Sequence, residues 1–162
     1  MAGGWQTGLT LNMARPSGAE GEDQASRRYR LVIADDHADV RQQIRELLDP
    51  EFEILRAVGD GAALVAAAAE LHPDAIVSDI QMPEMDGIEA CCQVLGRGVC
   101  EVAVALSTYP DRHLVQTAIE AGIRGYVLKL DAAEELIPAV YAAMRGDRYL
   151  SAGVRGRQLP DR

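Results

Sequence analysis

The sequence has few cysteines and no long apolar run. Three cysteines occur in 162 residues, at positions 91, 92 and 100, and none belongs to a CxxC motif or has a histidine nearby. This spacing favours reduced, mostly buried thiols over a disulfide framework or a zinc site. No apolar run reaches the roughly 20 residues of a membrane helix, and the first 21 residues lack the pattern of a secretory signal. We therefore expect a soluble, cytoplasmic protein with no membrane partner.

Positive charge is also scarce. Sixteen Lys and Arg residues stand against 25 Asp and Glu residues, which gives a formal net charge of −9 and an isoelectric point near 4.8. An acidic surface repels a phosphate backbone, and the body of the sequence contains no basic patch that would offset this repulsion. We therefore expect no direct nucleic-acid binding by this chain.

The chain length and texture predict one domain with two extensions. Residues 1–28 are rich in Gly, Ser and charge with little periodicity, so we expect a disordered N-terminal extension, and Met13 is an alternative start. Residues 29–150 form the predicted domain. Residues 151–162 are predicted to be a short tail or linker stub.

Within the domain, short apolar runs alternate with helical patterns about every 21 to 27 residues. The predicted strands are residues 31–34, 54–58, 75–78, 102–106 and 126–128. The predicted helices are residues 40–48, 64–71, 87–95, 112–121 and 132–145. Five strands alternating with five helices predict an α/β fold, with an open parallel sheet covered on both faces.

Polar side chains follow four of the five predicted strands. Asp35 and Asp36 follow the first, Asp79 the third, Ser107 the fourth and Lys129 the fifth. Sites in such sheets form beyond the carboxyl ends of the strands. Three carboxylates repel one another unless a cation intervenes, and Mg²⁺ prefers oxygen ligands. We expect Asp79 to attack a phosphoryl donor, while Mg²⁺ and Lys129 neutralise the phosphoryl oxygens and Ser107 donates a hydrogen bond.

Four motifs then carry a resemblance: "LVIADDH", "IVSDIQMPEMDG", "VALST" and "AGIRGYVLK". Over about residues 29–150 the sequence resembles the receiver domain of two-component response regulators. The resemblance implies a flavodoxin-like (CheY-like) sheet of five parallel strands in the order 2-1-3-4-5, with five helices on its two faces. It also implies that a sensor histidine kinase or a small acyl phosphate is the phosphoryl donor, and that a homodimer can form on phosphorylation.

The resemblance assigns roles to individual residues. Asp79 would be the phosphoacceptor. Asp36 and Asp79 would bind Mg²⁺ directly with the backbone carbonyl of Gln81, and Asp35 through water. Ser107 would be the switch hydroxyl and Tyr126 the switch aromatic, with Lys129 beside the phosphate. Such a protein is not an enzyme acting on other substrates, although it would catalyse its own phosphorylation and dephosphorylation.

Other positions near the site have simpler interpretations. His37 is expected to face solvent at the start of the first helix, Asp86-Gly87 to form the turn into the third helix, and Met82-Pro83 to pack a loop.

Several alternatives stay open. The segment "GYVLKLDAAEELIPAVYAAMRGDRYLS" is similar to the NarL/FixJ subfamily, in which a helix-turn-helix DNA-binding domain follows the receiver. Only eleven residues follow Ser151, so a truncated transcriptional regulator is one alternative. A pseudo-receiver that only binds partners is a second. A haloacid-dehalogenase-like phosphatase also uses an aspartate nucleophile and Mg²⁺, but its nucleophile usually follows the first strand in a DxD pattern.

Overall fold

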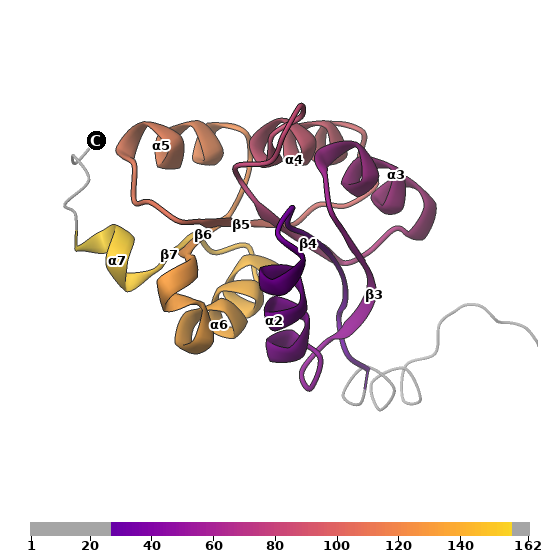
Figure 1. The fold of residues 1–162 in the computed structure, drawn as a ribbon, viewed down its shortest axis with the longest axis horizontal. Coiled ribbons are helices and arrows are strands. Elements are labelled where there is room, and N and C mark those ends of the chain that lie inside the picture. The colour runs from indigo at the N-terminus through magenta and orange to yellow at the C-terminus, as the bar shows by residue number, and fades with distance from the viewer. Residues whose placement is uncertain (1–26, 157–162) are drawn as a thin grey trace, which may run out of the picture.

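The computed structural model describes residues 27–156, which are organised around one parallel sheet (Figure 1). The sheet has six strands in the order β3-β2-β4-β5-β6-β7, and every neighbouring pair is parallel. The strands are β2 (Arg30–Ala34), β3 (Glu53–Val58), β4 (Ala75–Asp79), β5 (Ala103–Ser107), β6 (Gly125–Leu128) and β7 (Tyr149–Leu150). The first five have the predicted flavodoxin-like order.

Five helices cover the two faces of the sheet. They are α2 (Ala38–Leu48), α3 (Gly61–Leu71), α4 (Gly87–Gly96), α5 (Arg112–Glu120) and α6 (Ala132–Met144). Figure 1 shows α3, α4 and α5 on one face, and α2 and α6 on the other. The three-layer arrangement confirms the predicted fold class.

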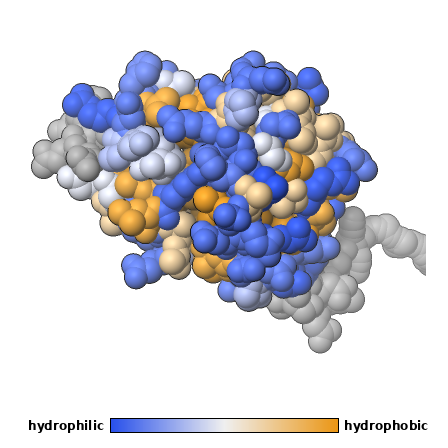
Figure 2. All heavy atoms as spheres, in the orientation of Figure 1, coloured by the Kyte–Doolittle hydropathy of each residue, from blue (hydrophilic) through white to orange (hydrophobic). Residues whose placement is uncertain are grey.

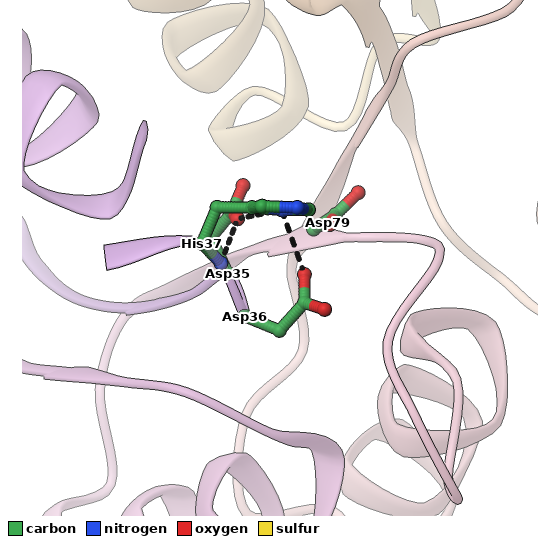
Figure 3. A group of neighbouring side chains, drawn as sticks. All are labelled: Asp35, Asp36, His37 and Asp79. Carbon is green, nitrogen blue, oxygen red and sulfur yellow. Dashed lines mark hydrogen bonds and ion pairs between the residues drawn. The ribbon is translucent and has the colours of Figure 1, made fainter. Parts of the chain in front are cut away.

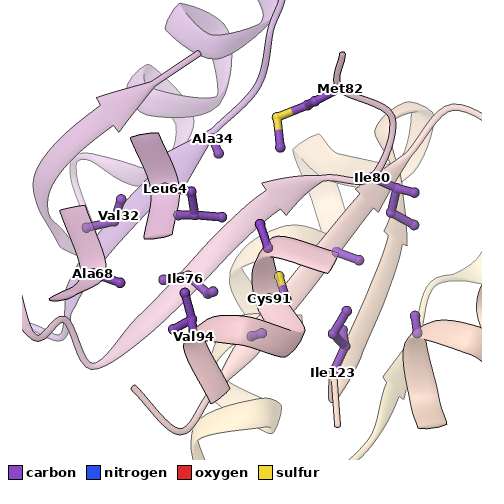
Figure 4. Packing of buried hydrophobic residues seen from close by; sticks show 14 of the residues in the cluster. Val32, Ala34, Leu64, Ala68, Ile76, Ile80, Met82, Cys91, Val94 and Ile123 are labelled. Carbon is purple, nitrogen blue, oxygen red and sulfur yellow. The ribbon is translucent and has the colours of Figure 1, made fainter. Parts of the chain in front are cut away.

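The core lies in two apolar layers, one on each face of the sheet. Successive residues of a strand point to opposite faces, so Val32 and Ala34 pack with α3 and α4, while Leu31 and Ile33 pack with α2 and α6. Figure 4 shows the first layer, including Val32, Ala34 and Ile76. Burial on both faces is the reason why these strands are almost entirely apolar in sequence.

The prediction of five strands was wrong by one. Tyr149 and Leu150 form β7, which pairs with β6 beyond the expected edge of the sheet. Two residues are too few to give a period-two signal, so the sequence pattern does not reveal this strand. Residues 151–156, at the start of the predicted tail, continue into the short helix α7 (Ala152–Arg155). Of the predicted N-terminal extension, 1–28, residues 1–26 lie outside the described residues.

The cysteines differ in burial, and the surface is largely hydrophilic on the face that Figure 2 shows. All three cysteines are free; Cys91 and Cys100 are buried and Cys92 is exposed. Burial raises the pKa of the Cys91 thiol to about 12. On the face shown in Figure 2, hydrophilic residues cover most of the area and interrupt the apolar patches. Among the described helices, none has the length and apolarity needed to cross a membrane.

The start of α4 packs so closely against the end of β4 that only glycine fits at position 87. A Cβ atom on Gly87 would lie 1.9 Å from the backbone oxygen of Asp79. In addition, Gly87 N–H donates to the Ile80 oxygen at 2.7 Å. This contact fixes the loop that leaves Asp79, so the glycine positions the carboxyl end of β4.

We predict that Gly87→Ala lowers the free energy of unfolding by about 1–3 kcal/mol, because the new methyl group must displace the backbone of Asp79. Gly96→Ala, at the other end of the same helix, is the matched control. A Cβ there meets nothing within 4 Å, and alanine is the better helix former, so stability should rise by up to about 1 kcal/mol. Urea unfolding of both variants measures this, and equal responses would contradict the close packing at Gly87.

Candidate functional site

Three aspartates lie together at the carboxyl ends of two neighbouring strands of the sheet. Asp79 is the last residue of β4, and Asp35 and Asp36 directly follow β2. These strands are neighbours with Ala34 opposite Ser78, so the residues that come next emerge side by side. Carboxylate oxygens of all three, with a ring nitrogen of His37, lie within 4.8 Å of one another (Figure 3). The predicted acidic cluster is therefore present.

Lys129 reaches this cluster from the far side of β5. It follows β6 and begins the single 3₁₀ turn η2 (Lys129–Asp131). Its Nζ lies 2.9 Å from Asp35 Oδ2 and 3.3 Å from Asp79 Oδ2. Burial works against the charged ammonium, but the close contact with Asp35 and the charge of Asp79 outweigh it and raise the pKa of Lys129. The ammonium is thus held in its charged form between the two carboxylates.

Asp79 lies in an environment that disfavours its charged form. Its side chain is almost completely buried. Burial raises the pKa of Asp79, and the charge of Asp35 adds to this effect, while Lys129 and the Gln81 N–H work against it. The Gln81 N–H donates to Asp79 Oδ1 at 3.3 Å. A poorly solvated carboxylate is a stronger base and a stronger nucleophile than one in water.

Two oxygens of the cluster have no hydrogen-bond donor. Within the described part of the chain, Asp35 Oδ2 and Asp36 Oδ1 are the buried side-chain atoms that lack a hydrogen bond. Lys129 approaches the first only as an ion pair, and His37 Nδ1 lies 3.2 Å from the second. Buried carboxylate oxygens without a hydrogen bond are costly unless cations satisfy them, and here one ammonium serves both Asp35 and Asp79. The oxygen-rich donor set fits Mg²⁺, with Asp35, Asp36 and Asp79 as the residues that would hold it.

Ser107 and Tyr126 meet at the backbone of Tyr109. Ser107 Oγ donates to the Tyr109 carbonyl at 3.0 Å and accepts from the Tyr109 N–H at 3.2 Å. The hydroxyl of Tyr126 donates to the same carbonyl at 3.4 Å. Ser107 and Tyr126 are both buried. Sequence reasoning missed the backbone of Tyr109 as the link between the two residues predicted to act as a switch, because no side-chain pattern marks a backbone acceptor.

The neighbouring residues largely match their predicted roles. Asp86 caps α4 by accepting from the Glu89 N–H at 2.8 Å, as the turn interpretation requires. Met82 is buried in the core. His37 is mostly exposed at the start of α2, as expected, yet its ring also approaches the acidic cluster. The contact seen at Gln81 uses its N–H, so the role of its carbonyl stays a prediction.

Comparison with known families identifies the kind of domain. Residues 31–141 match the family model described as the response regulator receiver domain. The chain belongs to this family. The match includes Asp35, Asp36, Asp79, Ser107 and Lys129. It decides in favour of a receiver domain and against the phosphatase alternative.

Relatives place this receiver domain near the NarL/LuxR group. It is 36% identical over 132 residues to the transcriptional regulatory protein LiaR of Bacillus subtilis, covering 80% of this chain and 63% of LiaR. It is 32% identical over 128 residues to the nitrate/nitrite response regulator NarP of Escherichia coli, covering 78% of this chain and 60% of NarP. The chain thus spans about three fifths of the length of these curated relatives.

Solved structures give the same result for the fold. The crystal structure of a LuxR-family two-component response regulator from Aurantimonas sp. SI85-9A1 has a TM-score of 0.74 and 26% identity, and the match covers 82% of this chain and 99% of that one. The response regulator domain of Thermotoga maritima CheB has a TM-score of 0.68 and 25% identity, with 74% and 98% coverage. The receiver architecture therefore extends over nearly all described residues.

The raised pKa of Asp79 leads to a stability prediction for the metal-free protein. The unfolded chain releases this proton near its ordinary value of 3.8, whereas the folded chain releases it at higher pH. As pH rises through this window, the unfolded state loses its proton first and stability falls. The Asp79→Asn variant should therefore have a higher free energy of unfolding than wild type at pH 7 in EDTA.

The gain should vanish as pH falls below 3.8, where the wild-type carboxyl is protonated in both states. Urea unfolding of the variant and of wild type, from below pH 3.8 up to pH 7, measures this difference in free energy of unfolding. Asp39→Asn, an exposed carboxylate in the first turn of α2, is the control and should show no such gain. A destabilised Asp79→Asn protein at pH 7 would contradict the role of burial at Asp79.

Proposed function

We propose that this receiver domain is a phosphorylation-operated switch, in which Asp79 accepts a phosphoryl group in a Mg²⁺-dependent reaction. The observation that carries the proposal is the convergence of Asp79 with Lys129 and with two carboxylates whose buried oxygens lack donors. A nucleophile, a fixed positive charge and a ligand set for a divalent cation are the parts that phosphoryl transfer needs.

In the proposed reaction an oxygen of the ionised Asp79 attacks the phosphorus of a phosphohistidine on a sensor histidine kinase. The new bond is an acyl phosphate, the phosphorus–nitrogen bond breaks, and the imidazole leaves with its electron pair and takes up a proton. The Lys129 ammonium balances negative charge that arrives on the phosphoryl oxygens. When bound by the aspartates, Mg²⁺ supplies further positive charge to the same oxygens.

The same residues support reaction with a small acyl phosphate, because the donor needs only a good leaving group in line with the carboxylate. Loss of the phosphoryl group follows when water attacks phosphorus and the Asp79 carboxylate leaves. The protein would thereby catalyse its own phosphorylation and dephosphorylation without acting on other substrates. A histidine kinase as donor places the chain in the cytoplasm, where its three free thiols are compatible with the reducing conditions.

We propose further that Ser107 and Tyr126 transmit the modification. In the unmodified structure both hydroxyls bond to the Tyr109 carbonyl. A phosphoryl group on Asp79 offers strong acceptor oxygens, and Ser107 would turn from Tyr109 to donate to one of them. Freed from this shared contact, Tyr126 and the face formed by α5, β6 and α6 would rearrange, and a homodimer through that face is the proposed consequence.

A transcriptional output is a second candidate for the protein as a whole, favoured by relatives such as LiaR, which is named a transcriptional regulatory protein. Immunoprecipitation of the native protein with its associated DNA tests this possibility. A lack of enrichment of any promoter, in cells where Asp79 is phosphorylated, would contradict it.

We predict that wild type with Mg²⁺ gains the mass of one phosphoryl group from acetyl phosphate and binds beryllofluoride. Asp79→Asn should abolish both, since it removes the nucleophile while keeping the shape, and EDTA should prevent both in wild type. Asp39→Asn is the control for a lost carboxylate and should react normally. Unchanged labelling of Asp79→Asn in intact-mass spectra would refute the assignment.

We also predict that Ser107→Ala still binds beryllofluoride but no longer transmits its binding to Tyr109. In wild type, beryllofluoride should shift the Tyr109 amide signal in NMR spectra, because its acceptor Ser107 Oγ turns away. Thr117→Ala is the matched control, since Thr117 Oγ1 also donates to a backbone carbonyl, that of His113 at 2.8 Å. An unchanged Tyr109 signal in wild type would argue against this switch.

A further inference from the structure

The segment 149–156, which we call the C-terminal clamp, is fastened to the turn that carries Lys129. Ser151 is completely buried. Its Oγ donates to Asp131 Oδ2 at 2.7 Å and accepts from the Leu128 N–H at 3.0 Å. Leu128 and Asp131 stand on either side of Lys129 along the chain. One hydroxyl group therefore ties together both ends of the turn from which the site lysine extends.

Two carboxylates complete the attachment. Asp131 Oδ2 also accepts from the Gly153 N–H at 2.9 Å. Glu135, in the first turn of α6, accepts from the Tyr149 hydroxyl at 2.7 Å and from the Ala152 N–H at 3.0 Å. The clamp is thus bonded to η2 and to α6, in addition to its β7 pairing with β6.

The contact between the clamp and the turn is also sterically close. A Cβ atom on Gly153 would lie 2.5 Å from Leu128 Cδ1 and 2.9 Å from Asp131 Oδ2. Val154 is fully buried in the core layer on the α5 side of the sheet. Figure 1 shows α7 beyond β7, at the edge of the sheet next to β6. Movement of the turn therefore requires movement of the clamp.

The orientation of Ser151 is specific to this contact. Ser151 stands immediately before α7, where a serine hydroxyl ordinarily accepts from an N–H of its own helix. Here the hydroxyl makes no such bond. It points to Asp131 instead, and Asp131 and Glu135 accept from the first N–H groups of α7. Because the buried Ser151 hydroxyl both donates and accepts a hydrogen bond here, it fixes one arrangement more strictly than apolar packing would.

We propose that Ser151 and Asp131 are positioning residues for Lys129, and that docking of the C-terminal clamp is coupled to occupancy of the phosphoryl site. The inference rests on the proposed function. Without a phosphoryl group the Lys129 ammonium sits against Asp35 and Asp79. With one, it must reach the phosphoryl oxygens from a turn whose ends the clamp holds. Coupling between two sites is reciprocal, so a filled site in turn holds the clamp closed.

The first experiment uses wild type alone. Hydrogen exchange is followed at the amides of Leu128, Ala152 and Gly153, the three N–H groups that bond within the attachment. We expect saturating beryllofluoride with Mg²⁺ to slow their exchange by about fivefold or more, the lower range of typical allosteric coupling. Unchanged or faster exchange of these amides at saturation would overturn the inference.

The second experiment measures beryllofluoride affinity by calorimetry in Ser151→Ala and Asp131→Asn. Each substitution should weaken beryllofluoride binding by about the factor by which beryllofluoride slows amide exchange in the clamp. The two factors should be similar because the coupling between two sites is the same in both directions. Asp74→Asn is the matched control, because Asp74 Oδ2 also accepts a backbone N–H, that of Arg30 at 2.8 Å, but at the amino end of β4. It should bind beryllofluoride as wild type does.

The outcomes separate this inference from the proposed function. If wild type binds no beryllofluoride, the proposed function itself fails. If wild type binds it, and the folded clamp variants bind equally well, the clamp has a structural role only and the inference is wrong. Circular dichroism establishes which variants fold. Should neither clamp variant fold, the exchange measurement on wild type decides by itself.

Discussion

The attraction between one ammonium and two buried carboxylates holds the carboxyl edge of this sheet together. Among the described residues, Lys129 is the one lysine or arginine that forms an ion pair with the carboxylates of Asp35 and Asp79. Without it, two negative charges would face each other in a poorly solvated place, where repulsion is strong. Even with it, the raised pKa of Asp79 means that the folded protein bears an electrostatic cost. Functional sites often carry such local instability, which the rest of the fold compensates.

The buried strands that carry these charged residues compensate for the electrostatic cost. β2, β4 and β5 lie in the interior of the sheet and are buried almost throughout, so each is anchored in both apolar layers. Their parallel register places the last residues of neighbouring strands level with one another. The close contact at Gly87 then fixes the loop after Asp79. The acidic cluster is thus a consequence of rigid elements, which keeps repelling groups together better than flexible loops would.

Lys129 differs from the aspartates because hydrogen bonds, more than apolar packing, hold the turn that carries it. The strand before it is short, and a single 3₁₀ turn carries it. The hydrogen bonds of Ser151, Asp131 and Glu135 supply the stiffness that apolar packing supplies elsewhere. The same edge of the molecule joins the site to Tyr126, whose backbone oxygen accepts from the Ser151 N–H at 3.0 Å. Lys129, Tyr126 and the C-terminal clamp therefore share one set of contacts around β6.

The sequence by itself determined the class of fold and the charged residues that gather at the carboxyl edge of the sheet. Apolar runs at regular spacing reveal strands buried on both faces, and Asp35, Asp36, Asp79 and Lys129 stand where those runs end. These are local signals, since each depends on a few consecutive residues. The tertiary structure decided the sixth strand, the bonding of Ser151 to the Lys129 turn, and the meeting of Ser107 and Tyr126 at the Tyr109 backbone. Those features join residues as many as 25 positions apart, such as Arg124 and Tyr149, through single hydrogen bonds, and no periodic pattern in a sequence encodes such pairs.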